Sequence, residues 1–334
     1  MRYLIVLILY ALAHGAWAQV WEDRQVFNQG AGAPLRIISS TDIELFAPLI
    51  DAFVLRNPTV AIEYLATGTA DIDRVFRETP EAYDIVISSA MDLQLKLTND
   101  GYALALDNVP HPAWAEWRQS LFGFTTEPAA IVINRAAFKG HPIPQSRQEL
   151  IEALRARPEV FRERIGTYDV RRSGLGYLFA TQDARASETF WRLMEVMGGL
   201  DAQLYCCSRD MINDLIEGNI VVAYNVLASY AEARARSKDV LKIVLPSDFP
   251  TTMMRTAFVS KVTRQPAAAE KFIQFLVTYQ TGPADAARLL PPLQGRGSGA
   301  DRAAIALEPA LMTFLDRLKR AKFLAEWESA LIQN

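Results

Sequence analysis

Short apolar, β-branched segments alternate with amphipathic helical segments along the first third of the chain. The expected strands are residues 35–39, 60–66 and 83–88, and the helices between and after them are a segment ending at Asn57-Pro58, residues 69–77 and residues 91–99. This alternation is typical of a parallel sheet with helices on both faces.

A second set of strands and helices follows after residue 129. Ser146 and Glu149 form a capping box, which predicts the start of a helix. The expected strands are residues 129–134, 164–170, 220–224, 241–245 and 253–260, and the expected helices are residues 187–197, 208–217, a segment from 228, residues 267–278 and a stretch up to 332. We therefore predict a second α/β lobe.

The N-terminus has the three parts of a secretory signal peptide: Arg2, an apolar run over residues 3–13, and Ala16-Trp17-Ala18 before Gln19. We expect a signal peptide over residues 1–18, and 316 of the 334 residues to remain after cleavage. That length exceeds what one core usually supports. The expected organisation is residues 33–126 plus 251–334 as lobe 1 and residues 127–250 as lobe 2, joined by two crossing strands.

Charge and composition exclude several classes of function. The formal net charge of −3 becomes −4 without Arg2, and no basic stripe suits a nucleic acid. No later segment is apolar enough to span a membrane, so we expect no membrane-embedded part after cleavage. His111 and His141 each precede a proline, and no catalytic motif or zinc-ligand spacing is present, so we expect no enzyme, no metal and no cofactor.

The two cysteines, Cys206 and Cys207, are adjacent. Export makes their oxidation possible, but a bond between neighbours closes a strained ring, and metal capture lacks a nearby His or third Cys. We interpret them as bystanders.

The loops after the first three strands carry small hydroxyl residues at expected helix starts. Ligands of open α/β sheets lie beyond the carboxyl ends of strands, where helix N-termini offer unpaired N–H groups, so we expect phosphate or carboxylate oxygens here. Each hydroxyl would also be an ordinary N-cap, and Thr41 with Glu44 forms a capping box. The candidates are Ser39, Ser40, Thr41, Thr67, Gly68, Thr69, Ser88 and Ser89.

The second lobe contains the strongest anion signal, at residues 168–177, where two arginines precede a glycine-bearing turn into a helix. An arginine there would supply a planar fork to an anion, while Ser173 and the amides after it would add donors. Solvated arginines on a loop are the alternative. The candidates are Arg171, Arg172, Ser173, Gly174, Asn225, Tyr230 and, on the returning strand, Arg255.

The order of these motifs resembles the periplasmic solute-binding proteins of the ferric-iron-binding (type 2) family. The resemblance covers residues 34–334, and it is similar to the phosphoglycerate-transport regulatory branch at Arg172-Ser173-Gly174, residues 224–227, residues 255–258 and the closing helix around Phe314. It implies a two-lobed periplasmic-binding-protein fold, each lobe a mostly parallel sheet flanked by helices, with hinge strands between.

The resemblance also implies a periplasmic protein that holds a small ligand between its lobes, with an ABC permease or a sensor kinase as partner. Iron binders of this type carry adjacent tyrosines where this chain has Ser229-Tyr230. We therefore expect a phosphorylated or carboxylated organic anion for an ABC transporter. The alternatives are a sensory role beside a histidine kinase and a ferric-ion carrier.

Overall fold

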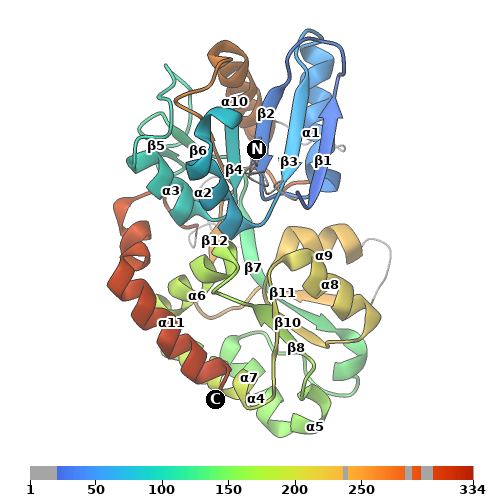
Figure 1. The fold of residues 1–334 in the computed structure, drawn as a ribbon. Coiled ribbons are helices and arrows are strands. Elements are labelled where there is room, and N and C mark those ends of the chain that lie inside the picture. The colour runs from blue at the N-terminus through green and yellow to red at the C-terminus, as the bar shows by residue number, and fades with distance from the viewer. Residues whose placement is uncertain (1–20, 236–239, 283–287, 295–303, 334) are drawn as a thin grey trace, which may run out of the picture.

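The computed structural model describes residues 21–235, 240–282, 288–294 and 304–333. The expected signal peptide, residues 1–18, lies outside the described residues. Figure 1 shows two α/β halves, one above the other, connected by strands. No helix within the described ranges combines the length and the apolar character needed to cross a bilayer.

The upper half, here the first lobe, is built on a seven-stranded sheet in the order β1-β3-β2-β4-β13-β6-β5. Only the β3-β2-β4 centre is parallel; β1, β13, β6 and β5 pair antiparallel. The strands are β1 Asp23–Phe27, β2 Leu35–Ser39, β3 Ile62–Ala66, β4 Ile85–Ser88, β5 Glu116–Trp117, β6 Leu121–Gly123 and β13 Thr256–Val259.

The lower half, the second lobe, has the strand order β11-β7-β10-β8-β9, with β12 paired to β7. Its parallel part is β10-β8-β9, which ends at the edge strand β9, whereas β7 runs antiparallel to β10, β11 and β12. The strands are β7 Glu127–Asn134, β8 Ile165–Tyr168, β9 Gln203–Tyr205, β10 Val222–Leu227, β11 Leu241–Val244 and β12 Thr252–Met253. The two-lobed α/β fold is thus confirmed. Both sheets are mixed: three adjacent strands in each pair parallel, and the other pairings are antiparallel.

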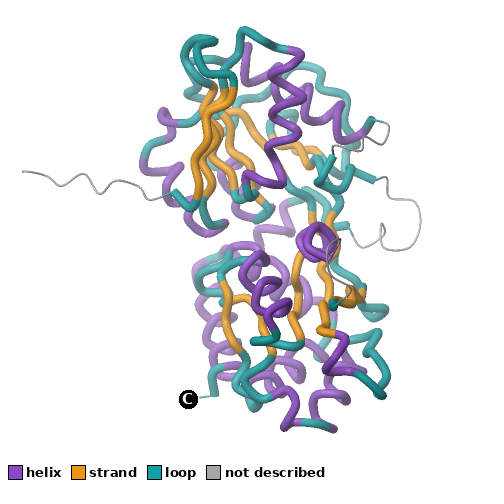
Figure 2. Tube along the Cα trace, turned by 90° about the vertical axis from the view of Figure 1, so that its right-hand side faces the viewer, coloured by secondary structure: helices purple, strands orange, loops and turns teal. Residues whose placement is uncertain are grey.

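Helices cover both sheets (Figures 1 and 2). They are α1 Ile43–Arg56, α2 Thr69–Glu78, α3 Met91–Asn99, α4 Arg147–Ala156, α5 Pro158–Phe161, α6 Gly174–Ala186, α7 Thr189–Gly198, α8 Ser208–Glu217, α9 Ala228–Ala235, α10 Pro266–Thr281 and α11 Arg317–Leu331, with short 3-10 turns at Pro80–Ala82, Arg135–Phe138 and Pro309–Leu315. Ser146 caps α4 as expected, because its Oγ accepts from the amide of Glu149 at 3.1 Å, whereas the Glu149 carboxylate accepts from the amide of Gln145 at 2.7 Å and not from that of Ser146. Such a cap contributes about 1 kcal/mol.

The C-terminal helix differs from the expected organisation, which assigned residues 251–334 to the first lobe. Helix α11 packs against α7 of the second lobe, where Phe323, Trp327 and Leu331 are buried. Gly198, at the end of α7, allows this approach, because a Cβ there would lie 2.6 Å from the carbonyl oxygen of Ala330. The periodicity of α11 predicts a helix, but its packing partner depends on tertiary contacts.

Candidate functional site

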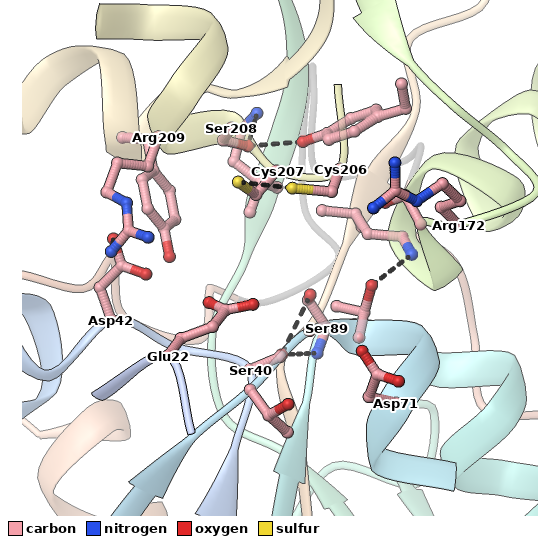
Figure 3. A pocket seen from close by; sticks show the side chains of 18 of the residues that line it. Glu22, Ser40, Asp42, Asp71, Ser89, Arg172, Cys206, Cys207, Ser208 and Arg209 are labelled. Carbon is pink, nitrogen blue, oxygen red and sulfur yellow. Dashed lines mark hydrogen bonds and ion pairs between the residues drawn. The ribbon is translucent and has the colours of Figure 1, made fainter. Parts of the chain in front are cut away.

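A cavity of about 180 Å³ lies between the lobes (Figure 3). It is at the carboxyl ends of the parallel strands of both sheets, β3-β2-β4 and β10-β8-β9. The residues that line it come from both lobes and from the link between β12 and β13. They are Glu22, Ser40, Asp42, Thr67, Gly68, Thr69, Asp71, Ser89, Tyr168, Arg172, Ser173, Leu175, Cys206, Cys207, Ser208, Arg209, Leu227, Tyr230 and Arg255.

Five of the eight candidates from the first lobe line this cavity: Ser40, Thr67, Gly68, Thr69 and Ser89. Ser40 Oγ accepts from the amide of Ser89 at 3.1 Å, so the β2–α1 and β4–α3 loops are joined. Helix α1 begins after Asp42 and α2 after Gly68, and neither N-cap residue supplies a side-chain cap. Unpaired N–H groups at a helix start suit an anion.

The other three candidates from this lobe, Ser39, Thr41 and Ser88, are buried and do not line the cavity. Ser39 Oγ accepts from the Thr41 amide, and Ser88 Oγ accepts from the amide of Ala90, both at 3.1 Å. The expected capping box is wrong at Thr41, because the N-cap of α1 is Asp42 and the hydroxyl of Thr41 accepts from Arg255 instead. These hydroxyls shape the loops.

The backbone amides at the start of α6 donate to side chains of the protein, although we expected them to be donors for a ligand. Ser173 Oγ accepts from the Gly176 amide at 3.1 Å. Thr69 Oγ1, from the opposite lobe, accepts from the amides of Gly174 and Leu175 at 2.9 and 3.3 Å. Gly174 lies at this close contact between lobes, where a Cβ would be 3.1 to 3.3 Å from first-lobe atoms. The prediction therefore needs correction: these amides bind the other lobe.

The two adjacent arginines of this turn have different surroundings. Arg171 forms ion pairs with Asp169, Nε to Oδ1 at 2.8 Å, and with Glu328, Nη1 to Oε1 at 3.4 Å. Its guanidinium lies over the ring of Trp327, and Arg171 does not line the cavity. Arg172 lines the cavity, and its guanidinium makes no hydrogen bond or ion pair with any residue the structure describes. Of these two adjacent arginines, only Arg172 is thus placed to meet a ligand.

Two further candidates have structural partners. Asn225 has a φ of 62° and donates to Asp183 at 2.8 Å within a buried network, outside the cavity wall. Arg255 is buried and forms an ion pair with Glu127, Nε to Oε1 at 2.7 Å, although this contact lacks hydrogen-bond geometry. Nη2 of Arg255 donates to Oε2 of Glu127 at 3.2 Å, so Glu127 neutralises much of its charge, and Nη1 donates to Oγ1 of Thr41 at 2.7 Å.

The cavity also contains carboxylates that the sequence did not reveal. Oδ2 of Asp42 lies 3.6 Å from Nη1 of Arg209, which belongs to the other lobe. Burial raises the pKa of Glu22, against the lowering effect of Arg209, and burial likewise raises the pKa of Asp42. Glu22 and Asp71 both approach Gly68, where an added Cβ would be 3.5 and 3.2 Å from their oxygens. The wall is therefore of mixed charge.

The cysteines, expected to be bystanders, line the cavity as well (Figure 3). They follow β9, a three-residue strand that the sequence pattern did not reveal, and precede α8. The rule that ligand-binding residues follow strand ends would have indicated Cys206, Cys207, Ser208 and Arg209 had β9 been recognised. Glu22, before β1, gave no comparable signal.

No family model and no curated protein matches the chain. The substrate-binding protein of an ABC transporter from Agrobacterium tumefaciens is 31% identical, with a TM-score of 0.84 over 92% of this chain and 98% of that chain.

Two more distant structures share the fold. AfuA from Actinobacillus pleuropneumoniae, with exogenous fructose-6-phosphate bound, is 12% identical, with a TM-score of 0.70 over 89% of this chain and 98% of that chain. Iron-bound HitA from Pseudomonas aeruginosa is 14% identical, with a TM-score of 0.65 over 89% and 99%. The identity and coverage of the Agrobacterium match place this chain in the family of substrate-binding proteins of ABC transporters.

Proposed function

We propose that the protein captures a small phosphorylated or carboxylated organic anion in the periplasm and delivers it to an ABC permease. The observation that carries this proposal is the guanidinium of Arg172, which lines the cavity and has no hydrogen-bonding or ion-pairing partner among the described residues. Across the cavity lie the uncapped start of α2 at Gly68 and the hydroxyls of Ser40 and Ser89. A phosphate or carboxylate is the ligand group that such donors stabilise.

The carboxylates narrow the ligand class. Glu22 and Asp71 would repel a bare anion, but their oxygens accept hydrogen bonds from hydroxyl groups. A phosphate ester carrying several hydroxyls, such as a phosphoglycerate or a sugar phosphate, would accept from the donors of the cavity through its phosphate and donate to the carboxylates through its hydroxyls. AfuA, a protein of similar fold, has exogenous fructose-6-phosphate bound in its structure, which supports this ligand class.

Calorimetric titration with phosphoglycerates, sugar phosphates and inorganic phosphate tests the proposal. We expect Arg172→Ala to weaken binding of the preferred ester about tenfold or more, since a charge-assisted hydrogen bond contributes roughly 1.5–3 kcal/mol. Arg171→Ala is the matched control, because that side chain is paired outside the cavity and its loss should leave affinity unchanged. Equal affinities for parent and Arg172→Ala would contradict the proposal.

A ferric carrier is the second candidate, favoured by two cavity tyrosines, Tyr168 and Tyr230, beside the carboxylates. Phenolate and carboxylate oxygens are hard donors that suit Fe³⁺. Burial raises the pKa of Tyr230 to about 12 and raises that of Tyr168 too, so ionisation of both phenols is costly. Ferric citrate should therefore leave the protein colourless; a tyrosinate charge-transfer band would support the carrier instead.

A further inference from the structure

We propose that Cys206, Cys207 and Asp210 bind a thiophilic divalent cation of the Zn²⁺ or Cd²⁺ type, with one coordination position open toward the ligand cavity. The two Sγ atoms lie 3.1 Å apart as free thiols. Oδ2 of Asp210 is 3.0 Å from Sγ of Cys207 and 3.9 Å from Sγ of Cys206. All three donor atoms are within 4.8 Å of one another.

Local structure accounts for this convergence. Adjacent side chains of an extended chain point to opposite sides, but here the chain turns from β9 into α8 between them. Cys207 is the N-cap residue and Asp210 lies in the first turn, so the helix brings the carboxylate back toward the thiol. Figure 3 shows both sulfur atoms facing the cavity.

The donor set indicates the class of ion. Thiolates prefer soft or borderline cations, and zinc accepts sulfur together with a carboxylate oxygen. Sulfurs bound to one tetrahedral zinc are about 3.7 Å apart at a Zn–S distance of about 2.3 Å, so the thiols need to separate by about 0.6 Å. Cys206 is exposed, which leaves room for this adjustment. Three protein donors leave a fourth position open, as in zinc sites that exchange ligands.

The cation displaces the thiol protons of Cys206 and Cys207, because cysteine binds metals as the thiolate. Binding should therefore release protons and become tighter as pH rises.

Oxidation would compete with metal binding, although the backbone opposes it. Adjacent Cα atoms are about 3.8 Å apart, closer than in ordinary disulfides, so the bond would be strained and easily reduced. The test therefore uses the full mature chain, reduced and stripped of metal by a chelator.

Cd²⁺ alone is titrated while sulfur-to-metal charge-transfer absorption is followed, and Zn²⁺ affinity is measured against a colorimetric chelator. We expect saturation at one equivalent, loss of the absorption band in Cys206→Ser and Cys207→Ser, and at least tenfold weaker binding in Asp210→Asn. Glu217→Gln, on the exposed end of the same helix, is the matched control and should bind as the parent does.

Melting curves establish that each variant is folded, and Cys206→Ser, which changes an exposed side chain, carries the test if Cys207→Ser is unstable. Absence of saturable binding to the reduced protein, or unchanged affinity in Cys206→Ser, would overturn the site. The titration contains no organic anion, so its outcome is independent of the function proposed above.

Discussion

Helices α1 and α2 on the first-lobe wall of the cavity and α6 on the second-lobe wall differ in how their starts are capped. On the first-lobe wall, α1 and α2 begin without a side-chain cap. On the second-lobe wall, α6 is closed by Ser173 from its own lobe and by Thr69 from the other. The starts of α1 and α2 therefore retain backbone donors for a ligand, whereas the start of α6 does not. The second wall contributes side-chain charge through Arg172 and Arg209, and its helix α8 also begins without a side-chain cap.

The contrast explains why a strong anion motif in a sequence need not bind its ligand through backbone amides. The turn before α6 has the arginines, the serine and the glycines of an anion site. In the folded chain its amides hold the lobes together, because Thr69 occupies the position an anion would take. The same physical preference of a helix start for an oxygen thus stabilises lobe contact.

The arginines of the cavity also differ, and the largest expected effect tests that difference. Glu127 accepts from Thr125, Ser229 and Arg255, all buried. Arg255→Met leaves the Glu127 carboxylate buried without its cation, and should lower the free energy of unfolding by about 3–5 kcal/mol in denaturant titrations. Arg255→Met with Glu127→Leu should recover much of this loss, since apolar replacement of a buried pair is often neutral.

A loss below about 1 kcal/mol in Arg255→Met would contradict the assignment of this arginine to the structural framework. Arg172→Ala should in contrast leave unfolding unchanged, because its guanidinium has no hydrogen-bonding or ion-pairing partner among the described residues.

Periodicity predicted most of the architecture. Residues 35–39, 91–99 and 208–217 form the expected β2, α3 and α8 with the same bounds. The missed strands gave no such signal: β5 and β9 have only two and three half-buried residues, β6 is buried but only three residues long, and β1 is mostly exposed and polar. Such strands are determined by the partner strands they pair with, which single-sequence patterns do not contain.

The site was predicted less completely, for a related reason. Ser40, Thr67 and Ser89 were found because they follow strands that the pattern revealed. Glu22 was missed, because the pairing of β1 with β3 brings it to the cavity from another part of the chain. Arg171 is held away from the cavity by Asp169 and by Glu328 of α11, which leaves Arg172 to line it. The spacing of residues in the sequence does not contain that information.

The mixed charge of the first wall predicts an opposite response of two ligands to one substitution. Glu22→Gln removes a carboxylate whose pKa is raised by burial. Sulfate, which carries no hydroxyl, should bind several-fold more tightly, whereas the preferred hydroxylated phosphate ester should bind several-fold more weakly, as roughly 1 kcal/mol of hydrogen bonding is lost.

The pH dependence of sulfate binding follows from the same carboxylate. As pH falls through the raised pKa of Glu22, its carboxylate is neutralised, repulsion decreases and sulfate affinity should rise; in Glu22→Gln this part of the dependence should disappear. Calorimetric titrations across mildly acidic pH measure both effects. Weaker sulfate binding in Glu22→Gln would show that Glu22 does not repel the anion.

The smallest expected effect concerns the contact that distinguishes the walls. Thr69→Val removes the oxygen that accepts from Gly174 and Leu175, so closing the lobes leaves two amides without an acceptor. Affinity should fall about two- to tenfold, corresponding to roughly 0.5–1.5 kcal/mol, and small-angle scattering should show a larger radius of gyration without ligand. Ser146→Ala is the control: it removes a cap inside the second lobe and should lower stability by about 1 kcal/mol with unchanged affinity and radius. If Thr69→Val behaves as Ser146→Ala does, Thr69 stabilises the fold without favouring closure of the lobes.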